Sequence, residues 1–280
     1  VDWKVKLPGT SSATPVVWSD HVFVNAVDHE KKEIHAICLS ASTGKVLWSH
    51  AVGKGRVHLD DRSDFSSPSP VTDGKHVAFF FGNADLIVYD MKGKEVWRRN
   101  LVPEGDKYFA FQWTFSTSPI LFEGTLIMQV LQRDVPFSFA GVPRGKDGAN
   151  NIPSYLEAFD FATGKPAWKV ERKGQAVAES LEAFTTPVIA PTSDSGGKLQ
   201  LLVAGGDALS GHEPGSGKEL WRWGTWNPGK IGHWRLVPSP VAGKGVALAC
   251  APKKSPVYAV DIKTGELLWK SKDKEVSSDV

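Results

Sequence analysis

Cysteine is scarce in this chain of 280 residues, which contains only Cys38 and Cys250. Both fall in predicted strands far apart in the chain, so we expect no mutual disulfide and two small buried side chains. Long apolar runs are also lacking, and no stretch approaches the roughly 20 residues that a membrane-spanning helix needs. Neither sign of charge is in large excess: the formal net charge is +2 and basic residues form no patch. Nucleic acid is therefore not an expected partner.

Tryptophan, by contrast, is abundant, and five of the eleven recur in one motif. From Val257, apolar and polar residues alternate up to Asp261, an Asp-x-x-Thr-Gly corner turns the chain, and a second apolar run ends at Trp269. This pattern predicts a β-hairpin. In every copy a glycine precedes the tryptophan by four residues: Gly44 and Trp48, Gly93 and Trp97, Gly164 and Trp168, Gly217 and Trp221, Gly265 and Trp269. We expect each glycine to supply positive φ and each tryptophan to cover a face between neighbouring repeats. Replacing Trp269 with alanine should then cost about 3–5 kcal/mol.

A Ser-Pro or Thr-Pro pair followed by an apolar run precedes each tryptophan motif, at Pro15, Pro70, Pro119, Pro187 and Pro240. Proline is tolerated at the start of a strand, so each repeat predicts four strands. Successive motif tryptophans lie 49, 71, 53 and 48 residues apart, close to the period of a four-stranded propeller blade. The sequence therefore predicts an all-β fold, a single propeller region over 1–280. Its predicted parts are blades at 11–50, 65–99, 115–170, 184–224 and 236–271, a loop inserted at 133–153, a clasp strand at 1–8 with Trp3, and the start of a further blade at 275–280.

The pattern Ala-x-Asp-x-x-Thr-Gly-x-x-x-Trp, complete from Ala259 to Trp269, resembles the tryptophan-docking motif of the pyrroloquinoline-quinone (PQQ) type β-propellers. That family includes quinoprotein alcohol dehydrogenases, a barrel-assembly lipoprotein and exported planctomycete-type repeat proteins. Some copies depart from the pattern: Ser40 and Glu213 replace the aspartate, and the corner at Asp90 is one residue short. The resemblance implies four-stranded antiparallel blades and a partial ring, about five blades of a seven- or eight-bladed propeller. It also implies an exported protein, in the periplasm or at the cell surface.

Candidate binding residues lie in the segments that lead from each tryptophan strand to the next Ser/Thr-Pro pair. Counted back from the proline, Asp64, Trp113 and Trp234 share one position, and Glu182 and Arg235 share the next. Equivalent positions in successive blades should converge, so we expect these residues, with their neighbours Gln112 and His233, to line a common mouth. There, aromatic faces would stack a planar or sugar ligand and the charged groups would fix its polar atoms. The alternative is that the tryptophans pack between blades and the charges form loop contacts.

No catalytic or metal-binding residue is predicted. His58, Asp60, Asp61 and Asp64 match neither a calcium loop nor a zinc pattern, which favours a solvated charged loop. No serine, cysteine or histidine lies in a nucleophile motif. Glu179 and Glu182 are a pair of carboxylates, but a glycosidase depends on their separation in space, which sequence does not give.

Two functions remain open at this stage, beside a purely structural role in an assembly. The first is a non-catalytic binding scaffold that presents its loop face to a protein or carbohydrate partner and needs no cofactor. It is favoured because the quinoprotein dehydrogenases of the resembled family carry an adjacent cysteine pair, which this chain lacks. The alternative is a PQQ-dependent oxidoreductase for alcohols or sugars, assisted by calcium. Glu182 or Asp64 would then serve as metal ligand or base, Arg235 would stabilise the reduced quinone, and Trp113 or Trp234 would form its floor.

Overall fold

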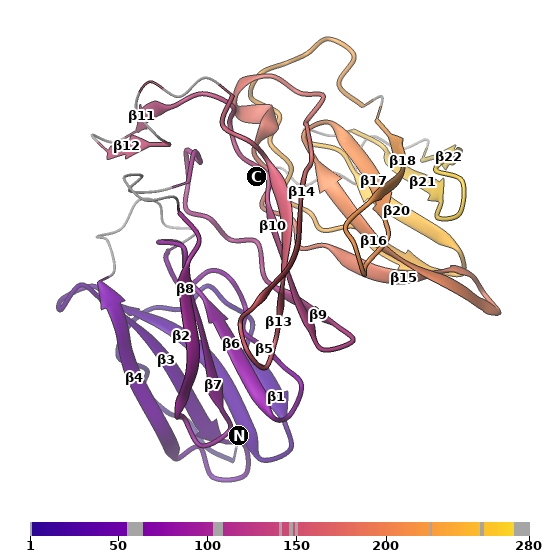
Figure 1. Ribbon diagram of the computed structural model, residues 1–280. Helices are drawn as coiled ribbons and strands as arrows, with labels where there is room; N and C mark the ends of the chain where they lie inside the picture. Colours follow the sequence, from indigo (N-terminus) through magenta and orange to yellow (C-terminus); the bar gives the residue numbers. More distant parts are fainter. Residues whose placement is uncertain are drawn as a thin grey trace. The chain divides into compact units, whose positions relative to one another are not determined.

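The computed structural model describes residues 2–54, 64–102, 109–139, 142–145, 148, 151–224, 226–252 and 255–271 (Figure 1). The chain divides into two compact units. Unit 1 comprises 1–126, 137–147 and 159–165, and unit 2 comprises 127–136, 148–158 and 166–280. Each unit is built from four-stranded antiparallel sheets, which we call blades.

Unit 1 contains the first two blades. Blade one has the strand order β1-β2-β3-β4 and blade two has the order β5-β6-β7-β8. Their strands are β1 (Val16–Trp18), β2 (His21–Asp28), β3 (Glu33–Ser40), β4 (Val46–Lys54), β5 (Val71–Thr72), β6 (His76–Phe80), β7 (Asp85–Asp90) and β8 (Glu95–Asn100). The middle strands are buried on both faces, whereas β4 and β8 alternate toward solvent. Continuous apolar runs in the middle strands follow from this two-sided burial.

Unit 2 contains the last two blades (Figure 1, orange and yellow). Blade four has the order β15-β16-β17-β18 and blade five the order β19-β20-β21-β22. Their strands are β15 (Val188–Ser193), β16 (Gly196–Gly205), β17 (Ala208–His212), β18 (Glu219–Trp223), β19 (Val241–Gly243), β20 (Val246–Cys250), β21 (Val257–Asp261) and β22 (Leu267–Lys270). A short 3-10 helix, η1 (Ala178–Leu181), precedes blade four.

The third sheet has the order β14-β13-β10-β9, and its residues are divided between the two units. Its strands are β9 (Ile120–Phe122), β10 (Thr125–Val130), β13 (Tyr155–Asp160) and β14 (Pro166–Glu171). The insertion predicted as a loop at 133–153 contains a two-stranded hairpin of β11 (Phe137–Phe139) and β12 (Val142–Arg144).

The corner that joins the last two strands of each blade shows why the Asp-x-x-Thr-Gly motif recurs. In blade three, the Asp160 carboxylate accepts from the Thr163 hydroxyl at 2.6 Å and from its backbone N–H at 2.8 Å. These hydrogen bonds, led by the hydroxyl, hold the pKa of Asp160 below its ordinary value. Gly164 then turns the chain with φ of 69°. In blade one, where Ser40 replaces the aspartate, Asp20 accepts from the Ser40 hydroxyl and the Ser42 backbone N–H. A second residue thus supplies the missing carboxylate.

Each corner glycine lies against a tryptophan that precedes it in the chain. A Cβ atom on Gly93 would meet the Trp48 ring at 2.7 Å, and one on Gly217 would meet Trp168 at 2.5 Å. The same contact joins Gly44 to Trp3, Gly164 to Trp97 and Gly265 to Trp221. Only glycine lets the indole approach the backbone this closely.

Several structural expectations from the sequence need correction. Whereas Trp221 of blade four is buried, the equivalent Trp269 is 51% exposed. Its replacement with alanine should therefore cost much less than the value expected for a buried tryptophan. Cys250 is only partly buried, although both cysteines are free. Residues 2–8 form no strand, but they are held against blade one. Trp3 donates to the Ala41 carbonyl at 2.8 Å, and Val5 and Leu7 pack against the core of β2 and β3. The further blade predicted at 275–280 lies outside the described residues.

Candidate functional site

Three backbone segments meet at one end of the sheets in unit 2. The Ala183 N–H donates to the Leu131 carbonyl at 3.1 Å, and the Phe184 N–H donates to the Leu236 carbonyl at 2.8 Å. Leu131 follows β10, Ala183 and Phe184 precede β15, and Leu236 precedes β19. Because neighbouring strands are antiparallel, the end of a second strand and the start of a first strand lie on the same side of the blades. We call this side the loop end of unit 2.

Four charged side chains form an ion-pair cluster at the loop end: Arg133, Glu179, Glu182 and Arg235. The Arg133 Nε donates to Glu182 Oε1 at 2.5 Å, and the Glu182 side chain is fully buried. The Arg235 Nη1 donates to Glu179 Oε1, and Arg133 Nη2 lies 3.9 Å from the other Glu179 oxygen. Two cations and two anions thus compensate one another in a largely buried setting, where an unpaired charge would be costly.

The loop that carries His233, Trp234 and Arg235 is fixed by hydrogen bonds. The Ser180 hydroxyl donates to the Ile231 carbonyl at 2.6 Å and accepts from the Trp234 N–H at 2.7 Å. Further back, Asn227 donates to the Asp207 carboxylate at 2.7 Å. Trp234 is half-buried, while His233 is exposed. His233 is therefore presented to solvent by a well-anchored loop.

Asp64, Gln112 and Trp113 lie in unit 1, whereas Glu182, His233, Trp234 and Arg235 lie in unit 2. The common mouth of all seven residues therefore stays a prediction. Within unit 1, the buried Asp64 carboxylate accepts from the Thr10 hydroxyl at 2.6 Å and from the Ser66 N–H at 2.8 Å. Trp113 packs edge-on against Phe139, with ring centroids 5.0 Å apart. These contacts match the alternative of loop packing. His58, Asp60 and Asp61 lie outside the described residues.

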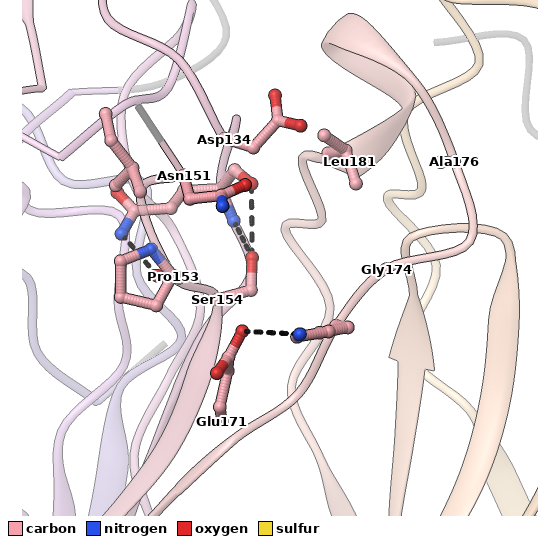
Figure 2. Close-up of a pocket in the computed structure, with 11 residues that line it drawn as sticks. Asp134, Asn151, Pro153, Ser154, Glu171, Gly174, Ala176 and Leu181 are labelled. Atoms are coloured by element: carbon pink, nitrogen blue, oxygen red, sulfur yellow. Dashed lines mark hydrogen bonds and ion pairs between the residues drawn. The ribbon is translucent and has the colours of Figure 1, made fainter. Parts of the chain in front are cut away.

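A polar cavity of about 490 Å³ opens beside the ion-pair cluster, on the loop end of unit 2. Its lining alternates charged, amide and apolar groups: Gln132, Asp134, Asn151, Ile152, Pro153, Ser154, Glu171, Lys173, Gly174, Ala176 and Leu181. Figure 2 shows Asn151, Pro153 and Ser154 on one side and Gly174, Ala176 and Leu181 on the other. The Ser154 hydroxyl accepts from the Gln132 N–H at 2.9 Å, which joins two of the segments that line the cavity.

Sequence reasoning missed Arg133 and the cavity residues from the insertion and from the end of β14. A usable signal was present, because the insertion at 133–153 connects a second strand to a third. Such connections lie at the same end of an antiparallel blade as the segments that precede a first strand. Residues of this insertion could therefore have been predicted to lie near Glu182 and Arg235.

The carboxylates of the ion-pair cluster do not fit a calcium ion that accompanies PQQ. Calcium takes six to eight oxygen ligands, largely from carboxylates that are free to coordinate it. Glu182 and Glu179 instead accept from arginine guanidinium groups. Within the described part of the chain, no three histidine, cysteine or acidic side chains are grouped to hold a metal ion. We therefore derive no chemical step through a quinone or a metal.

No helix within the described ranges is both long and apolar enough to cross a membrane.

The chain belongs to the PQQ-like propeller repeat family, through the model described as outer membrane protein assembly factor BamB, which matches residues 1–127 and 151–278. Together with the four-stranded antiparallel sheets, this match makes the chain an all-β propeller protein. No curated protein sequence matches it.

Solved structures support the same fold. BamB from Moraxella catarrhalis is similar with a TM-score of 0.56 and 17% identity, over 91% of this chain and 62% of that one. The quinohemoprotein alcohol dehydrogenase ADHIIG from Pseudomonas putida HK5 has a TM-score of 0.61 and 15% identity, over 96% and 43%. A europium-containing methanol dehydrogenase has a TM-score of 0.61 and 13% identity, over 92% and 50%. The chain thus spans between 43% and 62% of the length of these proteins, and at such identities the likeness is one of fold.

Proposed function

We propose that this chain is a non-catalytic, exported binding propeller that holds a protein partner at the loop end of unit 2. The observation that carries the proposal is the ion-pair cluster. Its carboxylates each accept from an arginine, so neither Glu179 nor Glu182 is free to act as a base or a metal ligand. What the cluster does supply is a rigid, charge-compensated platform beneath exposed loop residues such as His233.

A protein partner is favoured over a carbohydrate because the matching family model is described as an assembly factor. That description also supports an exported location. We further propose that binding needs no cofactor, since Glu179 and Glu182 are paired with arginines and the chain has no adjacent cysteine pair.

Site-specific photo-crosslinking in the source cell tests the proposal. A benzoylphenylalanine introduced in place of exposed His233 should give one discrete adduct, with a partner peptide identified by mass spectrometry. The matched control replaces Lys244, which is exposed in the turn that follows β19, at the opposite end of that strand from His233. Adducts of equal yield at both positions, or none at position 233, would contradict a specific loop-end partner.

A further inference from the structure

The cavity at the loop end has charged groups without strong partners. Within the described residues, the Asp134 carboxylate accepts no hydrogen bond, and Glu171 has only Lys173, at 4.0 Å. The Lys173 side chain is 83% exposed, so this pair is weak and screened by solvent. The lining therefore has two carboxylates and one ammonium, which leaves one net negative charge. A cationic group is the complementary ligand.

The cavity also has an apolar wall. Leu181 is buried and Ala176 is half-buried, and Pro153 lies across the opening from both (Figure 2). Ile152, which precedes Pro153 in the chain, is also half-buried and lines the cavity. Such a wall suits the aliphatic stem of a long basic side chain, which packs its methylenes on apolar surface while its charged end meets polar groups. A volume of about 490 Å³ exceeds one side chain, so neighbouring backbone of the ligand fits as well.

Arginine matches the polar groups better than lysine does. A guanidinium presents five donors in a fixed plane and binds carboxylates in a bidentate manner. Asp134 and Glu171 supply carboxylate acceptors, and Asn151, held at φ of 66°, adds an amide oxygen. Asparagine adopts this left-handed conformation more readily than most residues do.

We propose that this cavity binds an arginine side chain, with its flanking backbone, from a basic segment of the partner protein. The inference rests on the proposed function and names the chemistry of the partner at that site. Lys173 then competes with the incoming guanidinium for Glu171, so it limits the affinity.

The probe is a fluorescein-labelled Gly-Ser-Arg-Ser-Gly peptide, titrated with the full chain and followed by fluorescence anisotropy. A peptide with citrulline in place of arginine keeps the shape without the charge. We expect the arginine peptide to bind at least about fivefold more tightly than the citrulline peptide, with affinity falling as salt rises. Unlabelled spermidine, added as a competitor, distinguishes a free polyamine from a polypeptide source and should displace the peptide only weakly.

Three variants make the assignment specific to the cavity. Asp134→Asn and Glu171→Gln should each weaken the arginine peptide at least about threefold, because each removes one charge-assisted acceptor. Lys173→Met should strengthen it about threefold by removing the competitor. Asp194→Asn is the matched control, since Asp194 is exposed and does not line the cavity. Thermal melting should show all four variants folded, because none of these side chains is buried.

Equal affinity for the arginine and citrulline peptides would overturn the inference, as would weaker binding by Lys173→Met or stronger binding by spermidine than by the peptide. Its failure is separable from failure of the proposed function. If the peptide result is negative while crosslinking at position 233 remains specific, the loop end binds a partner through other chemistry. If crosslinking also fails, the proposed function falls with it.

Discussion

Arg172 shows how single residues hold unit 2 together. The side chain is 1% exposed, and its guanidinium donates to the Ser210 hydroxyl and to the carbonyls of Val203, Gly205 and Ala208. Burial lowers the pKa of Arg172 to about 9, so it remains charged at neutral pH. It joins the end of β14 to the β16–β17 hairpin, and its charge is solvated by backbone carbonyls.

His212, hydrogen bonded to Ser210, gives the first prediction. Burial lowers the pKa of His212 to about 4, with the Arg172 charge as a second cause. Between pH 6.5 and about 4 the unfolded chain therefore binds the proton and the folded chain does not. Stability falls as pH falls through this window, by up to about 3 kcal/mol. The free energy of unfolding, measured with denaturant at several pH values, should change less steeply with pH in His212→Gln than in the unmodified protein. The same pH dependence in both proteins would contradict this.

The buried pair of Arg133 with Glu182 gives the second prediction. Glu182→Gln keeps the shape of the side chain but removes the carboxylate that lies 2.5 Å from Arg133 Nε, so it should lower the free energy of unfolding by about 3 kcal/mol. The matched control is Glu157→Gln, whose partner Lys169 is half exposed and whose loss should cost less than about 1 kcal/mol. Equal costs in urea unfolding would show that the cluster is not structurally important.

At the scale of the strand and turn, the corner glycines make the sharpest comparison. Gly217 has φ of 73°, and a Cβ atom there would lie 2.5 Å from the Trp168 ring. Gly217→Ala should therefore cost about 2–5 kcal/mol from backbone strain and overpacking. Gly215, two residues earlier, has nothing within 4 Å of such an atom, so Gly215→Ala should be nearly neutral. Similar melting temperatures for the two variants would refute the docking role of this glycine.

The elements of the fold could be predicted because their signals are local. The alternation before Asp261 and the Gly-x-x-x-Trp spacing lie within a dozen residues, and the structure has positive φ at all five motif glycines. The site could be predicted only in part. Glu182 and Arg235 stood out by position, but their partners Arg133 and Glu179 lie 49 and 56 residues away along the chain. Such pairing depends on which backbone segments run side by side.

At the scale of the whole molecule, membership of the family does not determine the function. The propeller fold is shared with BamB and with quinoprotein dehydrogenases, whose names describe unlike proteins. A fold of this kind hosts different functions, and the site residues must decide between them. In this chain Glu179 and Glu182 are paired with arginines, which is why we propose a binding role for it.

Titration of the full chain with PQQ and calcium, following tryptophan fluorescence and the melting temperature, tests this central claim most directly. Calcium alone and the quinone alone serve as controls. A ligand present at 100 times its dissociation constant would stabilise the fold by about 2.7 kcal/mol, which a melting curve detects readily. We predict no saturable quenching and an unchanged melting temperature. Saturable quenching together with a rise in melting temperature would contradict the account and point to a quinone-dependent oxidoreductase.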